Sequence, residues 1–150
     1  MNSVYKTMFD GFKAIQSMSD IPTNIKILMW GHVYGMVPGW KVIGITKAAL
    51  EVFKYFDYKR PPGRGDYGVN RSHQYSRIET GRILFAKDDW EFDEFWEFVL
   101  SRDNTVLATA QENYSIQEEQ IDYAVPGGYF EAQGFAYKVN KKEKEFLKGL

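Results

Sequence analysis

The residues best suited to chemistry lie around His73, one of only two histidines in the chain. A neutral imidazole with an ordinary pKa of about 6.5 can take a proton from water at neutral pH and so generate a nucleophile. Arg71 and Arg77 flank this histidine, and a guanidinium offers two parallel donors to the oxygens of a phosphate. These residue types favour a general base beside an anion site. The alternative is a histidine that happens to sit in a polar strand.

A second segment, residues 104–113, reads Asn-Thr-Val-Leu-Ala-Thr-Ala-Gln-Glu-Asn and combines two amides with clear structural signals. The four residues that follow Asn104 are β-branched or apolar, which predicts a short buried strand. Thr109 and Glu112 have the spacing of a capping box, in which each side chain accepts a hydrogen bond from the other residue's backbone amide. The segment therefore predicts a strand that runs directly into a helix, with Asn113 in the first helical turn.

This segment resembles the second half of the HNH nucleases, which are also called the ββα-metal or His-Me finger family. In the homing-endonuclease branch of that family a strand reads roughly Asn-Leu-x-Trp-Val-Thr-x-x-Glu-Asn, and residues 104–113 align with it without a gap. The first half of the family's motif is a strand that ends in an Asp/Asn-His pair. The candidate for that pair here is Arg71-Ser72-His73, so the resemblance is close in the second half and loose in the first.

The resemblance implies metal-dependent hydrolysis of DNA phosphodiester bonds, with His73 as the general base. It implies that Asn113 and His73 converge on one hard cation, commonly Mg²⁺, which is bound through oxygen and stays largely hydrated. Asn104 would be a supporting residue, whose amide bonds the backbone and fixes the loop that aims His73. Arg71 and Arg77 would clamp the phosphate beside the base. A homodimer that cuts both DNA strands is left open.

Two departures from the family pattern bear on this interpretation. Family members often carry an acid just before the histidine, where this chain has Ser72. The missing carboxylate must come from elsewhere, or a water molecule takes its place. The interval from His73 to Asn104 is 31 residues, which is much longer than in the related homing enzymes. It contains a predicted helix of its own over residues 89–101, with Asp88 or Asp89 as the N-cap.

The composition is that of an ordinary globular protein with a single domain, residues 1–150. Hydrophobic residues make up 44% and charged residues 26%, which suits a genuine core. The aromatic share of 17% is high and indicates an aromatic core or stacking surfaces. There is no cysteine, so disulfides and thiolate zinc sites are excluded, and a cytoplasmic location is favoured. No apolar run reaches transmembrane length, so no membrane partner is expected.

Charge is divided along the chain, although the net charge is only −1. Residues 54–82 include seven basic and three acidic side chains, whereas residues 83–135 include two basic and twelve acidic ones. A phosphate backbone responds to local charge within a Debye length of about 10 Å, so the basic stretch is the predicted DNA contact. Part of it is the Pro/Gly-rich loop 61–65, for which a plain surface connection is an equal alternative. The candidate contacts are Arg60, Arg64, Arg71 and Arg77.

The remaining patterns predict an α+β fold, in which a ββα-metal core over residues 67–121 is wrapped by additional helices and followed by a C-terminal strand. Residues 1–60 are expected to be mainly helical. Residues 25–37 are left open between a helix and a strand that turns at Pro38-Gly39 to pair with 40–45. The predicted helices are 4–17, 47–56 with Thr46 as N-cap, 89–101, 110–120 with Thr109 as N-cap, and 141–150. The predicted strands are 67–75, 105–108 and 129–139 with a bulge at Gly134.

A non-enzymatic binding protein is the alternative from a different class. The acidic band from Asp88 to Asp122 could occupy the DNA-binding groove of a basic partner as a DNA mimic. Glu91, Glu94 and Glu97 belong to this band at three-residue spacing, although a solvated helix face explains them as well. Plasmid nicking that needs Mg²⁺ and stops with EDTA separates the two interpretations. A third interpretation, a small-ligand protein with an aromatic pocket, rests on the Trp and Tyr content alone.

Overall fold

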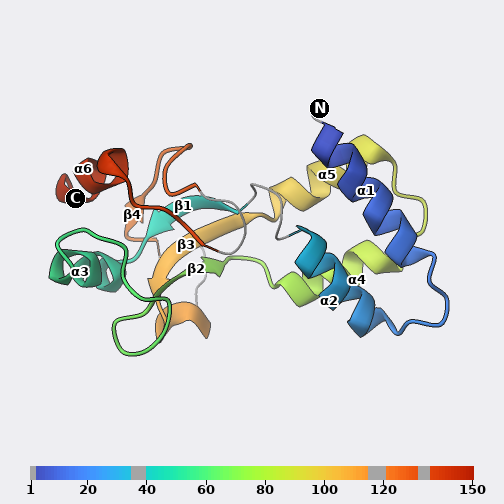
Figure 1. The fold of residues 1–150 in the computed structure, drawn as a ribbon, viewed down its shortest axis with the longest axis horizontal. Helices are drawn as coiled ribbons and strands as arrows, with labels where there is room; N and C mark the ends of the chain where they lie inside the picture. Colours follow the sequence, from blue (N-terminus) through green and yellow to red (C-terminus); the bar gives the residue numbers. More distant parts are fainter. Residues whose placement is uncertain (1–2, 35–39, 115–120, 132–135) are drawn as a thin grey trace.

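The computed structural model describes residues 3–34, 40–114, 121–131 and 136–150, and it shows an α+β fold with two halves (Figure 1). A four-stranded sheet with the helices α3 and α6 forms one end of the long axis, and the helices α1, α2, α4 and α5 form the other. The chain passes between the halves three times, before β1, after β2 and before β3. None of the described helices is long and apolar enough to cross a membrane.

The sheet pairs the two strands that the sequence predicted for the core. The strand order is β2–β3–β1–β4, and β2 runs antiparallel to β3 with His73 opposite Thr105. β1 runs parallel to β3. β3 lies between β2 and β1 in the sheet and is buried from its second residue onward. This burial agrees with its β-branched and apolar sequence. The strands are β1 (Lys41–Ile45), β2 (Val69–His73), β3 (Asn104–Thr109) and β4 (Tyr123–Ala124).

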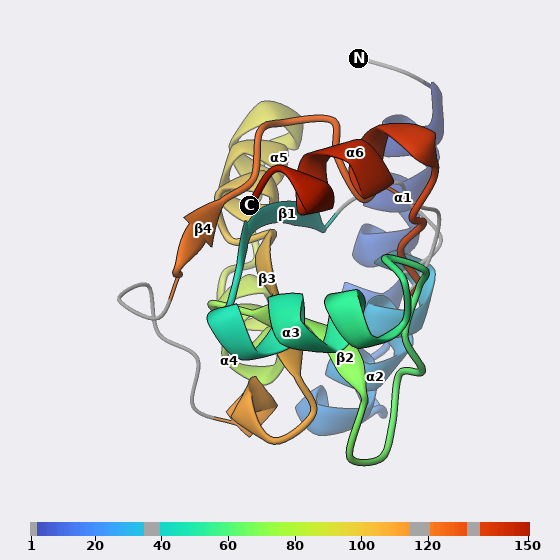
Figure 2. The ribbon, with the colours of Figure 1, turned by 90° about the vertical axis from the view of Figure 1, so that its left-hand side faces the viewer.

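The core of the sheet half lies between the sheet and the helices α3 (Lys47–Tyr55) and α6 (Lys141–Lys148), both of which face the viewer in Figure 2. Thr46 is the N-cap of α3, as predicted, since its hydroxyl accepts from the amide of Ala49. Asn140 and Glu143 form a capping box at the start of α6. The largest fully buried side chains of this core include Ile45, Leu50, Phe53, Leu107, Phe130 and Leu147.

The helical half encloses a second core that consists largely of aromatic rings. The ring centroids of Phe12 and Phe95 are 4.6 Å apart, and that of Trp30 is 5.5 Å from each of them. Trp96 is fully buried beside Phe95. Much of the high aromatic content of the sequence is therefore used in this core. The four helices are α1 (Ser3–Gln16), α2 (Thr23–Tyr34), α4 (Arg77–Ala86) and α5 (Phe92–Ser101).

One helix of this half decides between two alternatives that the sequence left open, and another was not expected. Residues 23–34 form a helix, so the strand alternative is wrong there, and the predicted turn at Pro38-Gly39 lies outside the described residues. α4 was not predicted at all. Its N-cap Ser76 accepts from the amide of Glu79, which is a Ser-x-x-Glu spacing that was present in the sequence.

The start of α5 is also corrected. The helix begins at Phe92 after an N-cap at Glu91, not at Trp90 after an aspartate. The reason is that Trp90 belongs to the connection, where its buried indole donates a hydrogen bond to the carbonyl of Leu84. The strand following Asn104 extends to Thr109 and is otherwise as predicted.

The predicted strand over residues 129–139 is wrong in its described part, residues 129–131 and 136–139. Phe130 has a left-handed φ of 57°, and its amide donates to the carboxylate of Glu143 rather than to a neighbouring strand. Phe130 and Tyr137 are buried by packing against α3, and Phe130 also contacts α6. The predicted bulge at Gly134 and most of the helix predicted to reach residue 120 lie outside the described residues.

Candidate functional site

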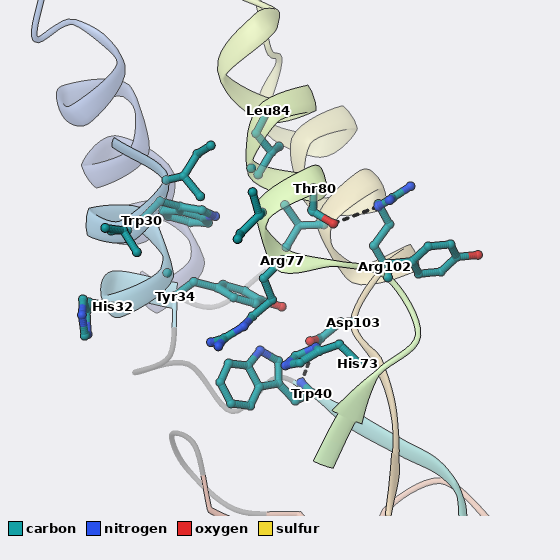
Figure 3. Close-up of a pocket in the computed structure, with 17 residues that line it drawn as sticks. Trp30, His32, Tyr34, Trp40, His73, Arg77, Thr80, Leu84, Arg102 and Asp103 are labelled. Carbon is teal, nitrogen blue, oxygen red and sulfur yellow. Dashed lines mark hydrogen bonds between the residues drawn. The ribbon is translucent and has the colours of Figure 1, made fainter. Parts of the chain in front are cut away.

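The segments that carry the predicted site residues meet where the sheet adjoins the helical half (Figure 3). β2 ends at His73, and α4 begins four residues later with Arg77. Alternation along β2 places Arg71 and His73 on one face and Ser72 on the other. Figure 3 shows Trp40, His73 and Arg77, which come from three different segments, grouped at the end of a pocket nearest to the sheet.

Trp40, which sequence reasoning assigned only to a strand, is the central side chain of this group. Its buried ring meets the imidazole of His73 edge-on, with 4.9 Å between the ring centroids. The guanidinium carbons of Arg71 and Arg77 lie 4.9 and 5.4 Å from the centre of the same indole. Because an aromatic face attracts cations, the ring helps to hold two like charges close to the imidazole.

The backbone of Trp40 is held in an unusual conformation. Its φ of 64° lies in the left-handed region, which costs a residue with a side chain about 1 kcal/mol or more. The Trp40 amide donates to the carboxylate of Asp103, and its carbonyl accepts from Nη1 of Arg71 at 3.4 Å. Asp103 was not singled out in the sequence, since nothing distinguishes it there from the other acids around it.

A pocket of about 490 Å³, here called the polar pocket, opens beside this group. Three of the four arginines predicted to contact DNA reach it, together with both members of the predicted His/Asn pair. The fourth arginine, Arg60, lies over the ring of Tyr137 at 5.2 Å from its centre. The polar and aromatic side chains that line this pocket are Trp40, Arg64, Asn70, Arg71, His73, Arg77 and Asn113.

Asn113 is positioned by the capping box that the sequence predicted. The Glu112 carboxylate accepts from the amide of Thr109 at 2.9 Å, and the Thr109 hydroxyl accepts from the amide of Glu112 at 3.3 Å. The same carboxylate accepts from the hydroxyl of Thr46 at 2.8 Å. These bonds tie η1 (Glu112–Tyr114), a short 3-10 helix that carries Asn113, to the ends of β1 and β3.

Ser72 and Asn113 are in direct contact. The hydroxyl of Ser72, which is buried in β2, donates to the carboxamide oxygen of Asn113. Because Ser72 immediately precedes His73, this bond holds the amide next to the strand end that carries the imidazole. The position at which the family often has an acid is thus joined to the predicted metal ligand.

Asn104 supports the end of β2 through its main chain. Its carbonyl accepts from the amide of Gln74, the residue after His73, at 3.1 Å. It also lies opposite Lys41 in the parallel pair of β1 and β3. The resemblance implied a bond from the side-chain amide of Asn104, whereas the link to this turn is made by the backbone.

Burial and neighbouring charges set the protonation states of the site. Burial lowers the pKa of His73 to about 4, and the positive charges of Arg77 and Arg71 act in the same direction. Burial also lowers the pKa of Arg71 to about 10, which still leaves it charged at neutral pH. Burial raises the pKa of Asp103 to about 6. The free site therefore presents an unprotonated imidazole among guanidinium cations, which is the state that a general base requires.

Oxygen ligands for a cation are few at this site. Among the described residues, no group of three or more His, Asp or Glu side chains is arranged to hold a metal ion. The carboxamide oxygen of Asn113 and the hydroxyl of Ser72 are the oxygens in contact with each other beside His73. Mg²⁺ commonly keeps several waters and is held by one or two carboxylates together with substrate phosphates. No Asp or Glu in the described part of the chain lines the polar pocket, so a cation there would have the neutral Asn113 oxygen as its protein ligand and would depend on the substrate phosphate for negative charge.

Comparisons with known proteins leave the function to be inferred from the site itself. No family model, no curated protein and no solved structure matches the chain. A pocket that combines three guanidinium groups, an unprotonated imidazole and amide oxygens is suited to a phosphate ester, because bidentate donors and fixed positive charge complement its oxygens.

Proposed function

We propose that the protein is a metal-dependent endonuclease that hydrolyses phosphodiester bonds of DNA at the polar pocket. The observation that carries this proposal is the convergence of His73 and Asn113, forty positions apart in the sequence, on one pocket. The bond from Ser72 to Asn113 keeps the imidazole-bearing strand and the amide together. A base, an oxygen ligand and fixed positive charges at one place are what hydrolysis of a phosphodiester requires.

His73 has the role of general base in this proposal, and it takes the proton of the water molecule that attacks phosphorus. With a pKa of about 4 the imidazole is a weak base in the free protein. Bound phosphate brings negative charge next to Arg71 and Arg77, whose positive charges contribute to that low pKa. Binding of the substrate therefore raises the pKa of His73 and strengthens the base when it is needed.

The arginines and the amide complete the proposed machinery. Arg71 and Arg77 hold the phosphate oxygens, and Arg64, in the loop before β2, lines the same pocket. A divalent cation held by Asn113 would polarise the phosphate and stabilise the leaving oxygen. The Ser72 hydroxyl donates to the Asn113 oxygen and holds the amide beside β2.

The topology supports the same proposal. β2 and β3 are antiparallel and are followed by the helical turn η1, which is the order of a ββα unit. His73 at the end of β2 lies opposite Thr105 near the start of β3. The long interval therefore begins and ends at the same end of the β2–β3 pair. The inserted helices α4 and α5 can extend from that end without disrupting the strand pairing.

Nicking of supercoiled plasmid DNA tests the proposal. The wild-type protein is expected to nick plasmid with Mg²⁺ or Mn²⁺ and to stop when EDTA is added. His73→Ala is expected to lose at least about 100-fold in rate, the usual contribution of general-base catalysis. Lys6→Ala, at an exposed position of α1 outside both pockets, is the control and retains activity.

Full activity of His73→Ala would overturn the assignment of the base. A wild-type protein that nicks no DNA with any divalent metal would overturn the nuclease. Tight binding of that inactive protein to a basic DNA-handling partner would then favour the acidic binding protein.

A further inference from the structure

A second pocket, here called the apolar pocket, lies between α2 and α4 and has a volume of about 310 Å³ (Figure 3). Aromatic and aliphatic side chains make up most of its lining, including Trp30, Tyr34 and Leu84. Its size is at the lower end of the range of small-ligand sites, about 300–1,000 Å³. The pocket therefore suits a small flat group better than a peptide or a large cofactor.

The apolar pocket adjoins the polar pocket. Trp40, His73 and Arg77 line both of them, so the two pockets share one wall. An anionic group in the polar pocket would therefore lie close to the end of the apolar pocket that these three side chains line. In a nucleotide, a phosphate and an aromatic base are separated by a single sugar, which matches this pairing of a charged site with an aromatic one.

The two glycines of the apolar pocket differ in what they are needed for. A Cβ at Gly81 of α4 would lie 2.7 Å from a side-chain carbon of Ile27, so the close packing of α2 against α4 requires that glycine. A Cβ at Gly31 of α2 would meet no atom within 4 Å. Glycine is unfavourable inside a helix, and neither packing nor backbone conformation requires it at position 31. Its effect is to leave the pocket open.

Polar groups are available at the end of the apolar pocket nearest to His73. The hydroxyl of Tyr34 is buried close to the Asp103 carboxylate, and the two groups interact. Both residues line the pocket. The edge of a nucleobase carries donors and acceptors that can bond such a pair of polar groups.

We propose that the apolar pocket binds an unpaired nucleobase of the DNA substrate, adjacent to the phosphate held in the polar pocket; this rests on the phosphate-binding part of the proposed function. The base packs among the aromatic and aliphatic side chains of the pocket, with its edge toward the Tyr34 hydroxyl and the Asp103 carboxylate. A base within an intact duplex is paired and stacked, so it must be unpaired or extruded before it enters. The substrate class is therefore DNA with a single-stranded or unpaired nucleotide at the cleavage position.

Binding of two small probes in EDTA, where no cleavage occurs, tests the pocket in the full-length protein. Deoxyadenosine 5′-monophosphate carries a base, and 2-deoxyribose 5-phosphate does not. The wild type is expected to bind the nucleotide about tenfold more tightly, the typical effect of one stacked base. Gly31→Leu fills the pocket and is expected to bind both probes equally, with Gly31→Ala intermediate. Ala14→Leu, on an exposed position of α1 outside the pocket, is the matched control and keeps the preference.

DNA binding identifies the source of the base. A duplex with one unpaired nucleotide is expected to bind the wild type about tenfold more tightly than a fully paired duplex, and Gly31→Leu is expected to lose this difference. Equal binding of the two small probes by the wild type, or an unchanged preference in folded Gly31→Leu, would overturn the base pocket. A preference for the small nucleotide without any preference between the duplexes would overturn DNA as its source.

The nicking assay separates this proposal from the nuclease. A base preference in a protein that nicks no plasmid would leave the pocket standing and remove the nuclease. Nicking without any base preference would do the reverse.

Discussion

His73 and Asp103 have pKa values displaced in opposite directions, so we expect their effects on stability to cancel in the wild type and to appear when either group is removed. The pKa of His73 is lowered from 6.5 to about 4, and that of Asp103 is raised from 3.8 to about 6, in both cases mainly by burial. His73→Gln and Asp103→Asn each remove one titration while keeping polar atoms at the same position. Asn at position 103 can still accept from the amide of Trp40.

The signs follow from which state binds more protons. As the pH falls from about 6.5 to about 4, the unfolded chain protonates His73 and the folded protein does not, so the free energy of unfolding decreases. As the pH rises from about 4 to about 6, the unfolded chain ionises Asp103 while the folded protein keeps it neutral, so the free energy of unfolding again decreases. A shift of one pKa unit corresponds to about 1.4 kcal/mol, so each of the two effects amounts to about 3 kcal/mol.

Urea unfolding followed by tryptophan fluorescence between pH 4 and pH 7, in EDTA, measures both effects. Relative to wild type, His73→Gln is expected to gain about 3 kcal/mol of unfolding free energy on going from pH 7 to pH 4. Asp103→Asn is expected to gain about the same amount on going from pH 4 to pH 7. His32→Gln serves as the matched control for removal of a histidine. If the unfolding free energy of both site variants relative to wild type does not change with pH, the assigned burial of the two groups is refuted.

Three further predictions concern metal binding, the support of η1 and the glycines. Asn113→Asp adds a carboxylate at an exposed position and is expected to lower the Mg²⁺ concentration for half-maximal nicking by about tenfold, and an unchanged metal requirement would contradict Asn113 as the ligand. Glu112→Ala removes the acceptor of three hydrogen bonds and is expected to cost about 3 kcal/mol in urea unfolding, more than Glu112→Gln. In thermal unfolding Gly31→Ala is expected to stabilise by about 1 kcal/mol and Gly81→Ala to destabilise by about 1–3 kcal/mol, and the same sign for both would contradict the packing of α2 on α4.

Local interactions between chain neighbours were predictable from the sequence. The cap at Thr46 and the capping box at Thr109 depend on residues three positions apart, and both form as expected. α4 was not predicted because its apolar side chains are spread around the helix and form no single apolar face. Leu84 is buried, whereas Ile78 and Ile83 are exposed. The alternating residues of 129–139 were misinterpreted because alternation indicates burial on one side and does not identify the partner that buries it.

The candidate site was predictable only in part, for the same reason. His73 and Asn113 were identifiable by residue type and by the family-like segment, and the structure places both at one pocket. Trp40 and Asp103 were not identifiable, because their importance arises from a backbone bond between residues 63 positions apart. Arg60 could not be separated from the other arginines, since its place over Tyr137 depends on how the segment before β2 crosses the C-terminal part of the chain.

The helices inserted between β2 and β3 belong to the site and are more than an addition to a ββα core. Arg77, at the start of α4, lines both pockets, and α4 supplies one side of the apolar pocket. Asp103, which directly follows the insert, holds Trp40 in its left-handed conformation and so fixes the wall between the pockets. A minimal ββα hairpin would retain His73 and Asn113 but would lack this wall. In the proposed enzyme the same insert thus lengthens the motif, completes the phosphate clamp and creates the space for an unpaired base.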